Sequence, residues 1–193
     1  MVITDGSRLG ISATPRRQYS IYSWLASRSW QRHSILCEAR DTRPFTLGGT
    51  VNDFRPIFGR CQCGTVRFRV DAPAQEMYHC HCSMCRRCHG TLFATYATAR
   101  REHVVVEQGS DNLETYDSSP DVHRRFCRTC GCHLLLNDDR WPHLQWFTPG
   151  TLEAGAHPGH PKDTEKHIFV ASKMPWHTLA DGLPQFEGFQ EDV

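Results

Sequence analysis

The sequence predicts a mostly β domain, and three observations support this expectation. Hydrophobic residues make up 39% and charged residues 22% of the 193 residues, a balance that permits a packed core. Residues 65–70 alternate between polar and apolar types, as a half-buried strand does. Groups of turn-forming residues recur at short intervals between such stretches. We therefore expect one domain of short strands, covering residues 55–193.

Residues 1–54 differ from the rest in composition. Five arginines and no acidic residue lie between Gly6 and Cys37, and serine and threonine are frequent. This composition resembles a mitochondrial transit peptide, but no sustained amphipathic helix emerges from it. We expect residues 1–54 to be a poorly ordered, Arg/Ser-rich N-terminal extension.

The strands are expected where apolar residues run in short stretches between turn signals. Turns are predicted at 71–73, 109–112, 137–139 and 148–150, each containing Gly, Pro, Asn or Asp. Residues 83–89 could form one or two helical turns. The expected strands are 65–70, 91–98, 103–107, 122–126, 133–136, 143–147 and 167–171.

Charge and hydropathy exclude several functional classes. Lys and Arg number 22 and Asp and Glu 21, so the formal net charge is +1, which disfavours a nucleic-acid-binding protein. No run approaches 18 apolar residues, so we expect no membrane span. The N-terminus has no apolar segment behind a basic start, so secretion is not indicated. We expect a cytoplasmic protein.

The cysteines are the unusual feature of the composition. There are 10 cysteines and 12 histidines, and nine of the cysteines lie between Cys61 and Cys132 in tight clusters. Residues two or three apart seldom form a disulfide with each other, but they converge readily on one ion. Since nothing indicates an oxidising compartment, metal binding is favoured over disulfides.

Two cysteine pairs predict a structural zinc site. Cys127 and Cys130 are three apart and are followed by Gly131, the form of a zinc knuckle. Cys61 and Cys63 are two apart, so they share one face of an extended chain. Each pair offers two thiolates, and together they would complete a closed, four-cysteine site that stabilises the domain.

A third cluster predicts a second metal site. Cys80, Cys82 and Cys85 offer three thiolates within six residues, and three protein ligands with one open position typify a catalytic zinc. Cys88 lies three residues further on and could close the site as a fourth ligand. The nearby histidines, His79, His81 and His89, could do the same. The spacing alone leaves an open and a closed site about equally favoured, and a closed one would suit a non-catalytic zinc module that binds a protein or nucleic acid.

Five motifs follow one another in a fixed order along the chain, at 59–68, 80–86, 126–131, 167–169 and 173–184. This ordered set resembles a known family, the glutathione-dependent formaldehyde-activating enzymes, which include centromere protein V. The resemblance covers about residues 58–189.

The resemblance implies a fold, two metal ions and an activity. It implies a β-tent fold with two zinc ions, one structural and one catalytic with an open position. It also implies a carbon–sulfur lyase that joins glutathione, as co-substrate, to formaldehyde and gives S-(hydroxymethyl)glutathione. The implied structural ligands are Cys61, Cys63, Cys127 and Cys130, and the implied catalytic ligands are Cys80, Cys82 and Cys85.

Several cysteine, histidine and arginine residues lie near these ligand sets without belonging to them. Cys88 and Cys132 depart from the family pattern, and each is expected to be an inert, buried thiol. His167 could stand near the open metal position or serve as a hydrogen-bonded structural histidine. Arg86 and Arg87 could pair with the carboxylates of glutathione, although a solvated surface pair is slightly favoured.

Overall fold

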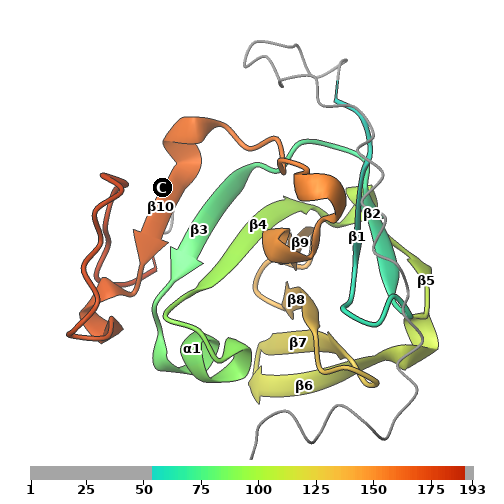
Figure 1. Cartoon of the computed structure of the whole chain (residues 1–193), viewed down its shortest axis with the longest axis horizontal. Coiled ribbons are helices and arrows are strands. Elements are labelled where there is room, and N and C mark those ends of the chain that lie inside the picture. Colours follow the sequence, from blue (N-terminus) through green and yellow to red (C-terminus); the bar gives the residue numbers. More distant parts are fainter. Residues whose placement is uncertain (1–53, 190–193) are drawn as a thin grey trace, which may run out of the picture. The chain divides into compact units, whose positions relative to one another are not determined.

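Between residues 54 and 189 the chain is mostly β, as expected, with two sheets and one α-helix (Figure 1). The computed structural model describes residues 54–189. The strands are β1 (Ile57–Arg60), β2 (Arg67–Val70), β3 (Glu76–Cys80), β4 (Ala94–Arg100), β5 (Val104–Gln108), β6 (Leu113–Ser119), β7 (Val122–Cys127), β8 (His133–Asp138), β9 (Leu144–Phe147) and β10 (Glu165–Ile168). The α-helix is α1 (Ser83–His89), between β3 and β4.

Short 3-10 turns join several of these elements. They are Arg101–His103, Ser110–Asn112, Pro149–Thr151, Glu153–Gly155, Lys162–Thr164 and Val170–Ser172.

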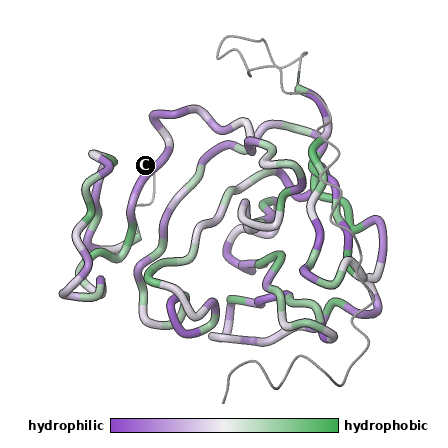
Figure 2. The backbone as a smooth tube through the Cα atoms, in the orientation of Figure 1, coloured by the Kyte–Doolittle hydropathy of each residue, from purple (hydrophilic) through white to green (hydrophobic). Residues whose placement is uncertain are grey.

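The smaller sheet has the strand order β1-β2-β5, and the larger has the order β10-β3-β4-β9-β8-β7-β6. The pairs are antiparallel except β10 and β3, which run parallel. Hydrophilic and hydrophobic residues are interspersed along the strands (Figure 2). This interspersion is what a sheet requires when its two faces meet different surroundings.

Two hydrophobic clusters use opposite faces of the larger sheet. The first joins the smaller sheet to one face and contains Phe68 and Phe147, whose ring centroids lie 6.2 Å apart. The second contains Tyr78, Tyr96 and Trp146. Because side chains alternate along a strand, Trp146 and its neighbour Phe147 enter different clusters. The three-cysteine motif reaches the second cluster, and Cys61 and Cys127 belong to the first.

The helical segment predicted at 83–89 is confirmed as α1, and each predicted strand overlaps an observed one. Three strands, β1, β3 and β6, were not predicted. The last strand, β10, covers Glu165–Ile168 and so lies earlier in the chain than the predicted 167–171. It ends at Ile168 because Phe169 has a φ of 57° and the chain then enters a 3-10 turn. The expectation for residues 1–54 falls almost entirely outside the described residues. No helix between residues 54 and 189 is long and apolar enough to cross a membrane.

Candidate metal centres

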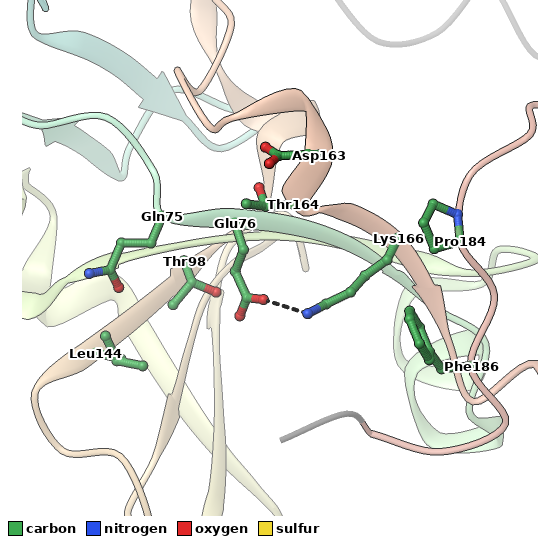
Figure 3. Close-up of a pocket in the computed structure, with 9 residues that line it drawn as sticks. All are labelled: Gln75, Glu76, Thr98, Leu144, Asp163, Thr164, Lys166, Pro184 and Phe186. Carbon is green, nitrogen blue, oxygen red and sulfur yellow. Dashed lines mark ion pairs between the residues drawn. The ribbon is translucent and has the colours of Figure 1, made fainter. Parts of the chain in front are cut away.

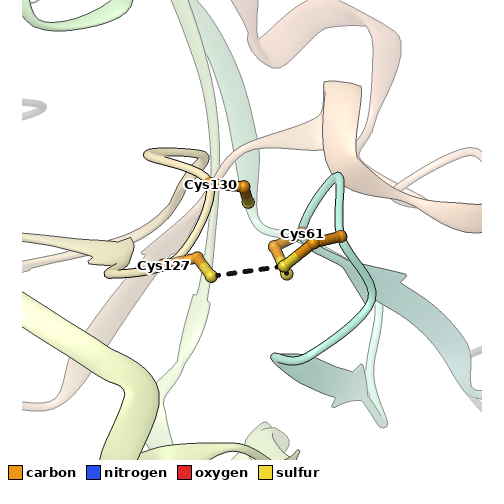
Figure 4. A group of neighbouring side chains, drawn as sticks. Cys61, Cys127 and Cys130 are labelled. Carbon is orange, nitrogen blue, oxygen red and sulfur yellow. Dashed lines mark hydrogen bonds between the residues drawn. The ribbon is translucent and has the colours of Figure 1, made fainter. Parts of the chain in front are cut away.

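The four cysteines of the predicted structural site come together. Cys61 and Cys63 lie in the turn between β1 and β2, whereas Cys127 ends β7 and Cys130 lies in the turn to β8. Their four sulfur atoms all lie within 4.8 Å of one another. Cys63 Sγ is 3.4 Å from Cys61 Sγ and 3.7 Å from Cys127 Sγ. Figure 4 shows Cys61, Cys127 and Cys130 gathered at this group. The turn of the smaller sheet thus meets the turn of the larger one at this group.

This sulfur group fits a zinc ion. A Zn–S bond of about 2.3 Å places tetrahedral sulfur ligands about 3.8 Å apart, close to the separations found here. Neutral donors face the sulfurs: Asn112 Nδ2 donates to Cys127 Sγ at 3.1 Å, and Val66 N donates to Cys61 Sγ at 3.3 Å. Hydrogen bonds with the side chain and backbone of Thr65 lower the pKa of Cys63 to about 6. The surroundings of Cys63 therefore favour its thiolate, the form that binds zinc, whereas burial raises the pKa of Cys127 to about 12.

The cysteines of the second group are positioned by the junction of β3 and α1. Cys80 is the last residue of β3, Cys82 is the N-cap of α1, and Cys85 lies in its first turn. The backbone N–H of Cys85 donates to Cys82 Sγ at 3.3 Å. The sulfur that caps the helix is therefore held next to Cys85. The three sulfur atoms lie within 4.8 Å of one another. This spacing also fits zinc.

The second group consists of two buried thiols and one partly exposed thiol. Cys80 and Cys85 are 4% and 5% exposed, and Cys82 is only partly buried. Hydrogen bonds with Cys80 and Cys85 lower the pKa of Cys82 to about 2, and the hydrogen bond with Cys82 raises the pKa of Cys80. A single thiolate is thus stabilised by two thiols, and it is the most accessible of the three.

Within residues 54–189, no fourth Cys, His, Asp or Glu ligand atom joins the three sulfurs. Cys88 instead lines a cavity of about 690 Å³ beside the zinc knuckle. His79 is bonded to Thr95 Oγ1 at 2.8 Å and to Glu165 Oε1 at 3.2 Å. The Nε2 atoms of His81 and His89 bond to His167 and Tyr96. The geometry thus favours the open arrangement over the closed one.

His167 lies away from the three sulfurs. It is fully buried, and its Nδ1 and Nε2 atoms are 2.9 Å from His81 Nε2 and Asp181 Oδ2. Because both ring nitrogens are engaged, His167 has the structural, hydrogen-bonded role that was the alternative to a place at the metal. The hydrogen bond from His167 also lowers the pKa of Asp181.

The two arginines that follow the three-cysteine motif have different environments. Arg86 donates to the His81 carbonyl oxygen at 3.2 Å and to Met174 Sδ at 2.8 Å, so it secures the C-terminal segment. Arg87 is exposed on α1.

Arg124 of β7 is the functional candidate that sequence reasoning missed. It is only 3% exposed, and its Nη2 atom donates to Cys85 Sγ at 3.4 Å. Its Nη1 atom donates to Tyr96 Oη at 2.8 Å, and its Nε donates to Ser118 Oγ at 2.9 Å. A permanent cation therefore lies against the three-cysteine group.

A separate cavity of about 440 Å³ opens near Glu76, the first residue of β3, at the opposite end of that strand from Cys80. Glu76 Oε2 and Lys166 Nζ form a 3.0 Å ion pair in it (Figure 3). The Thr98 hydroxyl, which is buried and has no hydrogen-bond partner, also lines it. This cavity belongs to neither cysteine group.

Comparison with known proteins places the chain in a family. Residues 56–172 match the family described as glutathione-dependent formaldehyde-activating enzyme. A protein of Halomonas elongata, provisionally named a glutathione-dependent formaldehyde-activating enzyme, is 28% identical over 125 residues, covering 61% of this chain and 77% of its own. A Pyrenophora teres f. teres protein with the same provisional name is 30% identical over 146 residues, covering 64% and 77%.

A crystal structure of a Rhodobacter sphaeroides protein is 31% identical, with a TM-score of 0.45, over 52% of this chain and 91% of that one. The match over residues 56–172 includes both cysteine groups, and in each group the sulfur atoms lie within 4.8 Å of one another. The chain therefore belongs to the glutathione-dependent formaldehyde-activating enzyme family.

Proposed function

We propose that the chain is a zinc-dependent carbon–sulfur lyase that uses glutathione and a small aldehyde such as formaldehyde. In the direction of addition, the thiol sulfur bonds to the carbonyl carbon and the carbon–oxygen π bond opens. The thiol proton ends on that oxygen, which gives S-(hydroxymethyl)glutathione. Atoms and charge balance, and no electrons are exchanged with a third reactant.

The observation that carries the proposal is the group of three sulfurs without a fourth protein ligand. Cys80, Cys82 and Cys85 would hold a zinc ion, and the partial exposure of Cys82 leaves a side for approach. Zinc bound there would offer a position at which a substrate thiol loses its proton more readily. The chain's own residues would orient that thiol and exclude water on the side of Tyr96 and Trp146, which are buried.

The other cysteine group would have a structural role. Cys61, Cys63, Cys127 and Cys130 supply four sulfurs, so a zinc ion among them would have no open position. We therefore propose two zinc ions per chain, one in each group. The nine cysteines in the described residues are all free, which suits the reducing conditions of the cytoplasm.

The test is the rate at which formaldehyde and its glutathione adduct exchange, measured by NMR with ¹³C-labelled formaldehyde. The zinc-loaded protein should accelerate exchange above the uncatalysed rate. Cys82→Ser should abolish the acceleration. Cys88→Ser makes the same change on the same helix but outside the three-sulfur group, so it should retain the acceleration. The zinc content of each variant is measured alongside.

No acceleration by protein with both sites loaded would contradict the proposal. It would favour the alternative, a zinc-binding module without catalytic function.

A further inference from the structure

The guanidinium of Arg124 is held by two hydrogen bonds within the fold, and its third nitrogen faces the three-cysteine group. Ser118 Oγ accepts from Nε, and Tyr96 Oη accepts from Nη1, so two nitrogens are committed within the fold. The remaining nitrogen, Nη2, lies 3.4 Å from Cys85 Sγ. At 3% exposure, the charge is shielded from solvent. A buried cation needs a partner, and Cys85 Sγ, which can carry negative charge as a thiolate, lies within hydrogen-bond distance of it.

Tyr96 keeps this arrangement fixed. The side chain is 2% exposed, and burial raises the pKa of Tyr96, so the phenol stays neutral. Because its oxygen accepts from Arg124, its hydrogen is available to His89 Nε2, 2.8 Å away. Burial lowers the pKa of His89 to about 4, so the ring is neutral and can accept. The chain from Cys85 through Arg124 and Tyr96 to His89 has consistent donors and acceptors throughout.

The formal charges show what Arg124 would do for a metal. Three thiolates and Zn²⁺ sum to minus one, and Arg124 brings the total to zero. An incoming thiolate then leaves minus one in place of the minus two that would arise without the arginine. Such differences matter most where burial limits solvent screening, and Cys80 and Cys85 are both buried.

Within the described residues, no cation donates a hydrogen bond to the sulfurs of the four-cysteine group. Its sulfurs receive hydrogen bonds from the Asn112 amide and the Val66 backbone, both neutral. Cys63 and Cys130 are exposed, so water can solvate its surplus negative charge. Charge compensation by a buried arginine is therefore a property of the three-cysteine group.

We propose that Arg124 is a positioning and specificity-determining residue that makes the three-cysteine site prefer an anionic thiolate over a neutral ligand in its open position. The inference rests on the proposed function, because it needs a metal with an open position. It adds the residue that selects the ligand's charge. It acts through Cys85 and the local field, without touching the aldehyde.

The experiment measures ligand preference in cobalt-substituted protein by visible absorption, which reports thiolate coordination. 2-Mercaptoethanol is the anionic probe, because it binds the metal as a thiolate. Imidazole is the neutral probe. Arg124→Met should weaken binding of 2-mercaptoethanol on the order of 10- to 100-fold, because the incoming thiolate loses its Coulomb attraction to a positive charge a few ångströms away in a buried site. Imidazole binding should change by less than about threefold.

Three further variants make the result specific. Arg125→Met removes the same charge from the next position of β7, which points to the opposite face, and both affinities should stay at the wild-type values. Arg124→Lys should recover part of the thiol affinity, because it restores the charge without the planar fork. Tyr96→Phe keeps the buried ring but releases the guanidinium, so thiol binding alone should weaken, even if Arg124→Met fails to fold.

The outcomes separate this inference from the proposed function. Equal loss of both ligands in Arg124→Met and Tyr96→Phe, or no loss of thiol affinity, would overturn the role of Arg124 while leaving an open site. A wild-type protein whose cobalt spectrum ignores 2-mercaptoethanol would overturn the proposed function, and this inference with it.

Discussion

The thiols of Cys85 and Cys88 lie one helical turn apart on α1 and have different surroundings. Cys85 is buried with the second hydrophobic cluster and belongs to the three-sulfur group. Cys88 is half-buried and faces the cavity next to Cys132, outside that group. Cys132 packs against the first cluster, in accord with an inert thiol. Position on the helix therefore separates a candidate ligand from a packing residue.

Cys88→Ser should leave both metal ions bound and lower the free energy of unfolding by no more than about 1 kcal/mol, because the site is half-buried. Cys85→Ser should lose the second metal under the same conditions. Metal content by mass spectrometry and thermal unfolding check both results. Loss of the second metal in Cys88→Ser would mean that Cys88 is a ligand and that the site is closed.

The spacing of the cysteines was enough to predict which of them assemble, because two or three residues fix how neighbouring thiols can point. Arg124 could not be found this way. An arginine in a strand is usually exposed, and only the packing of β7 against Tyr96 shows that this one is buried. The engagement of both His167 nitrogens likewise depends on Asp181 and His81, which the sequence does not place beside it.

At the scale of the elements, the turns hold the cysteines in register. Gly109, which follows β5, has a φ of 73° and packs against the backbone at Thr65, between Cys63 and β2. A Cβ atom at Gly109 would lie 2.3 Å from the Thr65 carbonyl oxygen, and Gln108 Nε2 donates to the same oxygen at 3.2 Å. This contact fixes the turn that carries Cys61 and Cys63.

Gly109→Ala should lower the free energy of unfolding by about 3 kcal/mol, since it combines left-handed strain with a collision against backbone. Gly182→Ala is the matched control: its φ is 77°, but nothing lies within 4 Å of the added Cβ. The control should lose only about 1 kcal/mol, the strain alone. Urea unfolding curves give both values, and equal losses would show that the collision at Thr65 is relieved by a small shift.

Strands were predicted correctly where the local sequence contains β-branched and aromatic residues, and were missed where it does not. Residues 65–70 and 122–126 contain β-branched or aromatic residues at regular spacing, and both overlap observed strands. Strand β3 reads Glu-Met-Tyr-His-Cys, with no β-branched residue, and β6 is mostly polar and exposed. Each is specified mainly by its neighbours, β4 and β10 for β3 and β7 for β6, which local sequence does not show.

At the scale of the whole molecule, the two cysteine groups differ in what they connect. The four-cysteine group joins the β1–β2 turn to the β7–β8 turn, so it ties the smaller sheet to the larger one across a long stretch of chain. The three-cysteine group lies within one β3–α1 junction. A metal in the first group would therefore restrain the fold as a whole, and a metal in the second would act locally.

Cys127→Ser should lower the free energy of unfolding by about 4 kcal/mol or more, because Cys127 is fully buried and its loss opens the link between the sheets. Cys82→Ser should lower it by no more than about 2 kcal/mol, since it disturbs one junction. Calorimetry of the zinc-loaded proteins measures both. Similar losses would contradict the division into a structural and an open site.

The central claim is that one metal has four protein sulfurs and the other has three with an open position. X-ray absorption at the zinc edge counts the sulfurs directly on protein that carries two zinc ions. The mean should be about 3.5 sulfurs per zinc, from four at one site and three at the other, and glutathione should raise it to about 4. A mean of 4 before glutathione is added, unchanged afterwards, would show that both sites are closed and would contradict the account.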